Sequence, residues 1–91
     1  ESPTYNNQVI DRINEVIRLY PQNSEAHYLL SNQYAIVNQY EKAIEELVIY
    51  KDLMNINPYR GGPSLKKVDK LMEKYYKIIN AKKPKGVIIQ Q

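Results

Sequence analysis

The chain has 91 residues, of which 43% are hydrophobic and 25% charged, with a net charge of +3 and no cysteine. This composition suits a single folded domain or part of one, and it excludes disulfides, thiol nucleophiles and thiolate zinc sites. No apolar run approaches the ~20 residues that cross a bilayer, and no signal-peptide pattern is visible. Because the sequence starts at Glu1 rather than Met, we expect a piece of a longer protein.

The first predicted helix begins near residue 8 and ends at Tyr20. Its apolar residues recur at helical spacing: Val9, Ile10, Ile13, Val16, Ile17 and Tyr20. Pro21 ends the helix because the residue before a proline disfavours helical backbone. Residues 1–7 are polar and include a proline, and we expect them to form a frayed end.

Two further helices are predicted between Pro21 and Pro58. Ser24 is the predicted N-cap of the first of them, since serine can accept a hydrogen bond from the first turn. The mainly apolar stripe of this helix is Ala26, Leu29, Leu30, Gln33, Tyr34 and Val37. Asn38 and Gln39 break the pattern. The stripe of the next helix is Tyr40, Ala43, Ile44, Leu47, Tyr50 and Met54, and Pro58 ends that helix.

A fourth helix is predicted after the glycine- and proline-rich loop at residues 59–63, with Ser64 as its N-cap. Its apolar stripe is Leu65, Val68, Leu71, Met72, Tyr75, Ile78 and Ile79. Adjacent residues cannot share one helix face, so either Tyr75 or Tyr76 should be exposed. Residues 81–91 read as a basic tail, in which residues 87–89 are too short a run to assign. The expected fold is therefore all-α, with about four helices joined by short loops.

The second and third predicted helices resemble a tetratricopeptide repeat, a helix–turn–helix unit of about 34 residues. The residues that fall on its Leu, Gly, Tyr, Ala and Phe are, in that order, Leu30, Ser31, Tyr34, Ala43 and Leu47. His27 stands where the pattern has Trp, and Pro58 stands slightly late for the closing proline.

The resemblance covers residues 8–58 and implies antiparallel helix pairs that stack into a superhelix. One full repeat would occupy residues 24–58, preceded by a half repeat. A capping helix at 64–80, which lacks the repeat signature, would complete a domain spanning residues 8–80. Ala43 should lie against the partner helix, with Tyr34, Tyr40 and Leu47 wedged between the pair.

The resemblance also implies a protein–protein interaction scaffold or adaptor that binds a peptide or helix in a concave groove. In this family the first helix of each repeat lines the groove. Carried onto this chain, the groove residues are Glu25, Tyr28, Asn32, Ala35 and Ile36, which share a face outside the core stripe. Because this helix carries no lysine or arginine, we do not expect it to clamp a C-terminal carboxylate.

Two alternatives remain open. Residues 1–57 carry a net charge of −4 and residues 58–91 one of +7. The lysine-rich end could dock on nucleic acid, a membrane surface or an acidic protein. Its candidate contacts are Lys66, Lys67, Lys70, Lys74 and Lys77. Self-association is the other alternative, because a short repeat array leaves one apolar end uncovered. The candidate residues for it are Val9, Ile13 and Ile17.

An enzyme is the least favoured class. His27 is the only histidine and is expected to pack between helices, while Glu41, Glu45 and Glu46 beside Lys42 suggest surface ion pairs. No catalytic residues, metal ligands or cofactors are predicted. We expect a soluble protein and favour the cytoplasm over the periplasm or secretion, although the absence of cysteine does not identify a compartment.

Overall fold

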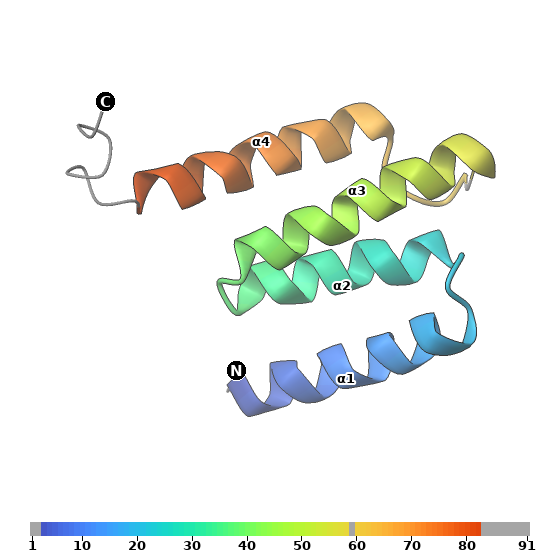
Figure 1. Cartoon of the computed structure of the whole chain (residues 1–91), viewed down its shortest axis with the longest axis horizontal. Helices are drawn as coiled ribbons and strands as arrows, with labels where there is room; N and C mark the ends of the chain where they lie inside the picture. The colour runs from blue at the N-terminus through green and yellow to red at the C-terminus, as the bar shows by residue number, and fades with distance from the viewer. Residues whose placement is uncertain (1–2, 59, 83–91) are drawn as a thin grey trace, which may run out of the picture.

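The computed structural model describes residues 3–58 and 60–82, which form four α-helices. They are α1 (Pro3–Leu19), α2 (Ser24–Ile36), α3 (Tyr40–Ile56) and α4 (Leu65–Ala81). Figure 1 shows the helices in a row in chain order, each running opposite to the one before it. The expectation of an all-α fold built from antiparallel helix pairs is confirmed. Residues 83–91 of the expected basic tail lie outside the described residues.

The start of α1 differs from the prediction. The helix begins at Pro3, so the described part of the segment expected to be frayed is helical. Proline is favoured at the first helical position, where its missing N–H loses no hydrogen bond. Asn6 in the next turn is buried, and its side-chain amide donates to Oε1 of Gln33 on α2 at 3.2 Å. This contact holds the first turns of α1 against α2.

Of the two serines predicted to be N-caps, only one caps its helix. The N-cap of α2 is Asn23 rather than Ser24, and Asn23 Oδ1 accepts a hydrogen bond from the Ala26 amide at 3.1 Å. Ser24 is the first helical residue and is buried. Ser64 caps α4 as predicted, because its hydroxyl accepts a hydrogen bond from the Lys67 amide.

The turn between α2 and α3 lies where the sequence predicts it. Asn38 has a φ of 65°, a left-handed conformation that asparagine tolerates better than most residues. The Gln39 amide donates to the Tyr34 carbonyl at 2.8 Å and the Asn38 amide donates to the Ala35 carbonyl. These bonds close the turn and fold α3 back along α2.

The core is centred on α3, which packs against α2 on one side and α4 on the other. Its buried cluster consists of Ala43, Ile44, Leu47, Tyr50, Val68 and Tyr75. Ala43 and Leu47 are fully buried, as the repeat resemblance implies, and Tyr34 and Tyr40 pack partly buried against the cluster. The Tyr50 hydroxyl donates to the Pro63 carbonyl at 2.7 Å, which fixes the α3–α4 loop to the core.

Some predicted stripe residues are not core residues. Leu29 on α2 is 45% exposed, and Val16 in α1 and Tyr20 just after α1 are also exposed. Among the described helices α1 contacts α2 alone, so only part of its apolar face is covered. Helical spacing identifies an apolar face but does not indicate how many neighbours cover it.

Candidate partner-binding groove

An open hollow of about 400 Å³ lies between α2 and α4. The hollow is lined by Asn32, Ala35, Ile36, Tyr40, Lys74, Tyr75 and Ile78. The residues at one side belong to the last turns of α2, those at the other side to α4, and Tyr40 begins α3 between them. Ile36 is 59% exposed here, so the hollow presents an apolar side chain to solvent.

A second, smaller hollow of about 150 Å³ opens near the start of α2. It is lined by Glu25, Tyr28, Leu29, Tyr50, Gly61, Gly62 and Pro63. The α3–α4 loop therefore forms its far wall, positioned by the hydrogen bond between Tyr50 and Pro63. Both hollows are bordered by the same side of α2.

Paired tyrosines lie beneath the two hollows. The Tyr28 ring is 5.7 Å from the buried Tyr50 ring, and the Tyr40 ring is 5.4 Å from that of Tyr75. Burial raises the pKa of Tyr75, and the nearby Tyr28 and Tyr40 raise it further. Because both hollows are bordered by the same side of α2, we call them together the α2–α4 groove.

All five residues predicted to line a groove border one of the two hollows. Asn32, Ala35 and Ile36 line the larger one, and Glu25 and Tyr28 line the smaller. The prediction lacked the opposite wall, which α4 supplies through Lys74, Tyr75 and Ile78. Tyr75 and Ile78 were both assigned to the core stripe, and Lys74, four residues before Ile78, lies at the edge of that stripe.

The predicted self-association residues Val9, Ile13 and Ile17 are each partly buried. The more exposed apolar side chains near the end of α1 are Val16, Leu19 and Tyr20. The five predicted anion-contacting lysines of α4 are all exposed. Helical spacing divides them, because Lys67 and Lys74 are two turns apart on one face while Lys66 and Lys77 lie on another.

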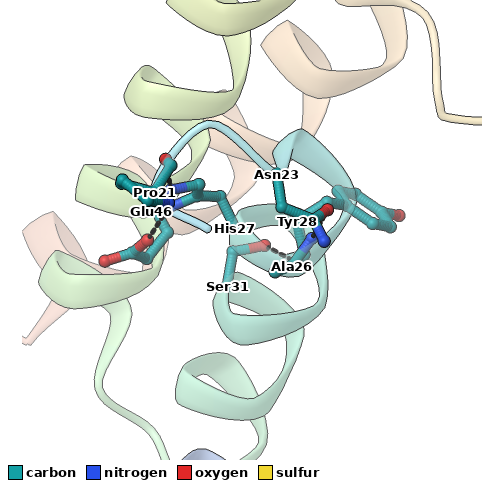
Figure 2. A network of polar contacts seen from close by, with 7 residues as sticks. All are labelled: Pro21, Asn23, Ala26, His27, Tyr28, Ser31 and Glu46. Carbon is teal, nitrogen blue, oxygen red and sulfur yellow. Dashed lines mark hydrogen bonds and ion pairs between the residues drawn. The ribbon is translucent and has the colours of Figure 1, made fainter. Parts of the chain in front are cut away.

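His27 holds a polar network that joins α2 to its neighbours (Figure 2). The ring is buried, with Nδ1 2.7 Å from Oε1 of Glu46 and Nε2 3.0 Å from the Pro21 carbonyl oxygen. The fully buried Ser31 hydroxyl donates to the Tyr28 carbonyl at 2.6 Å. His27 is therefore a packing residue, as predicted, and Glu46 contacts His27 rather than the expected neighbour Lys42.

Within residues 3–58 and 60–82, no group of three or more His, Cys, Asp or Glu residues is placed to hold a metal ion. In the same described part of the chain, no helix has the length and apolar content to span a membrane.

Part of the chain resembles a known protein family. A tetratricopeptide repeat model matches residues 13–45, which cover the last two turns of α1, all of α2 and the start of α3. This match supports a tetratricopeptide repeat in this segment of the chain. This repeat is in general a protein–protein interaction module and is typically non-catalytic. Neither the curated proteins nor the solved structures gave a match.

Proposed function

We propose that the chain is a scaffold or adaptor module whose α2–α4 groove binds a peptide or helix of a partner protein. The observation that carries this proposal is the larger hollow, where Ala35 and Ile36 of α2 face Tyr75 and Ile78 of α4. Apolar side chains exposed in a concave surface lose contact with water when a partner covers them, which favours binding.

Polar groups along the groove supply specificity. Asn32 has both a donor and an acceptor, so it can hydrogen-bond an extended peptide backbone in either sense. Tyr28 offers a rigid ring with a polar hydroxyl, although its contact with Tyr50 also gives it a structural role. Of the predicted pair, Asn32 is therefore the better residue to substitute.

A second candidate function uses the exposed face of α4. Lys66, Lys67, Lys70, Lys74 and Lys77 could together attract an anionic partner such as nucleic acid, a membrane surface or an acidic protein. This attraction would weaken steeply with salt, because it depends on charges in solvent. Self-association is a third candidate, favoured by a shallow hollow between α1 and α2 that contains Ile13, Val16 and Leu29.

Site-specific photo-crosslinking tests the groove against both alternatives. A photoreactive amino acid replaces Ile36 in one variant and Ile49, an exposed residue of α3 that lines neither hollow, in the control. Irradiation follows incubation with a lysate of the cells that make the protein, at low and at high salt. We expect protein adducts at position 36 that persist in high salt and are absent at position 49.

Equal crosslinking at both positions, or adducts that disappear in high salt, would contradict binding in the groove. Adducts of twice the chain mass, formed without lysate, would instead support self-association.

A further inference from the structure

The α2–α4 groove combines apolar side chains with positive charge. Lys74 lines the larger hollow beside Tyr75 and Ile78. Among the residues that the structure describes, no carboxylate lies within ion-pair distance of Lys74. Its charge is therefore available to a ligand that occupies the hollow.

Lys82 places a second positive charge next to a residue that lines the same hollow. Its Nζ lies over the Tyr40 ring, 5.4 Å from the ring centre, and Tyr40 lines the hollow. Lys67 lies two turns before Lys74 at i and i+7, which places both on one side of α4, and Lys70 lies between them along the helix. Positive side chains thus run along α4 beside the groove.

The acidic residues of α4 lie on another side of the helix. Asp69 forms an ion pair with Lys51 of α3, and Glu73 is four residues further along the same face. Within the described part of the chain, the only carboxylate that borders the groove is that of Glu25, in the smaller hollow. The larger hollow is therefore apolar beneath and positively charged along its α4 side.

We infer that the partner segment is acidic: its Asp or Glu side chains pair with Lys74 and Lys82, and a neighbouring apolar side chain fills the hollow over Ala35, Tyr75 and Ile78. This inference rests on the proposed function, since it names the chemistry of the ligand in the same groove. Opposite charge speeds encounter and selects among partners, while the apolar contact supplies affinity that salt does not screen. A purely polyanionic ligand leaves the apolar hollow unfilled, and a neutral peptide leaves the lysines without partners.

A random dodecapeptide display library, selected on the immobilised 91-residue chain, tests the inference before any natural partner has been identified. We expect the enriched peptides to be more negatively charged than the input library and to carry at least one apolar residue beside their Asp or Glu. The strongest peptide is then synthesised, and its Kd is measured by fluorescence anisotropy.

Two matched variants separate groove binding from general attraction to lysines. Lys74 lines the hollow, whereas Lys77, equally charged and also exposed, does not. We expect Lys74→Glu to weaken binding of the selected peptide by about tenfold and Lys77→Glu to change it by less than about twofold. Circular dichroism confirms that both variants stay helical.

The other outcomes are distinguishable. Enrichment of neutral or basic peptides that compete for the groove would overturn the acidic partner while leaving the proposed function standing. Equal loss of binding in both variants would indicate non-specific attraction to α4 and would also overturn the inference. Failure to enrich any peptide would overturn the proposed peptide-binding function, and the inference with it.

Discussion

The His27 imidazole on α2 and the Glu46 carboxylate on α3 form a buried polar contact between the two helices of the repeat, with Nδ1 2.7 Å from Oε1. The opposite nitrogen, Nε2, donates to the Pro21 carbonyl in the α1–α2 turn. One residue therefore ties together three successive segments of the chain. The repeat pattern has a large apolar Trp at this position, so a polar contact here replaces packing by a large ring.

Removal of this contact should destabilise the fold. His27→Ala leaves Glu46 and the Pro21 carbonyl without their partner, and an unsatisfied buried group costs about 1–3 kcal/mol. Glu46→Gln should cost less, because its amide can donate to Nδ1 of a neutral imidazole. Urea denaturation monitored by circular dichroism gives both values. The control is Glu45→Gln at an exposed position, and a His27→Ala variant as stable as that control would contradict the structural role of the contact.

Ala43 tests the close approach of α2 and α3. It is fully buried in the core cluster, so a larger side chain has no space to occupy. Ala43→Leu should lower the free energy of unfolding by about 1–3 kcal/mol through overpacking. Ala81→Leu makes the same change at an exposed position at the end of α4 and should have little effect. Equal stability of the two variants would show that the helices do not meet at Ala43.

The Tyr50 hydroxyl should stabilise the loop that walls the smaller hollow. Tyr50→Phe keeps the ring but removes the donor to the Pro63 carbonyl, at a cost of about 1 kcal/mol. Hydrogen exchange of the amides at Gly61 and Gly62 should become faster in this variant. Tyr76→Phe, at a half-exposed tyrosine on α4, provides the control. Unchanged exchange at both glycines would mean that the hydrogen bond does not hold the loop.

Tyr75 should make stability fall at alkaline pH. Burial, with Tyr28 and Tyr40 nearby, raises its pKa above the ordinary value of 10.0, so the folded state keeps a proton that the unfolded state has lost. The Tyr75 contribution to the free energy of unfolding is therefore complete below the unfolded-state pKa, and it is lost as the pH rises through the folded-state pKa. Unfolding free energies of Tyr75→Phe between about pH 9 and about pH 11 should therefore fall less steeply than those of the unaltered chain.

Tyr76→Phe controls for the loss of a tyrosine hydroxyl elsewhere on α4, and its pH dependence should match that of the unaltered chain. If the Tyr75→Phe curve instead parallels the Tyr76→Phe curve, Tyr75 does not titrate differently in the folded state.

Much of this fold could be predicted from the sequence because its signals are local. Apolar residues recur at helical spacing, prolines and the Asn38 turn interrupt them, and the Ser64 cap lies just before α4. Local signals failed where two adjacent residues compete for one role, as when Asn23 rather than Ser24 caps α2. They also failed at Leu29, whose exposure depends on how neighbouring helices pass it.

The candidate site could be predicted only in part for a related reason. The family resemblance placed Asn32, Ala35 and Ile36 on the groove side of α2. The opposite wall comes from α4, more than thirty residues later in the chain, and no local pattern pairs Lys74 with Ile36. The prediction for Glu46 was wrong for the same reason. Glu46 was expected to pair with a neighbour on its own helix, and it instead contacts His27 on α2.

Mapping of a bound ligand by NMR tests the central claim, that the α2–α4 groove is the binding site. The ¹⁵N-labelled chain is titrated with the strongest peptide from the display selection, and amide shifts are followed residue by residue. We predict that the largest shifts fall at Asn32, Ala35, Ile36, Tyr75 and Ile78, on both walls of the larger hollow. Shifts concentrated instead at Lys66 and Lys77, or along α1, would contradict binding in the groove.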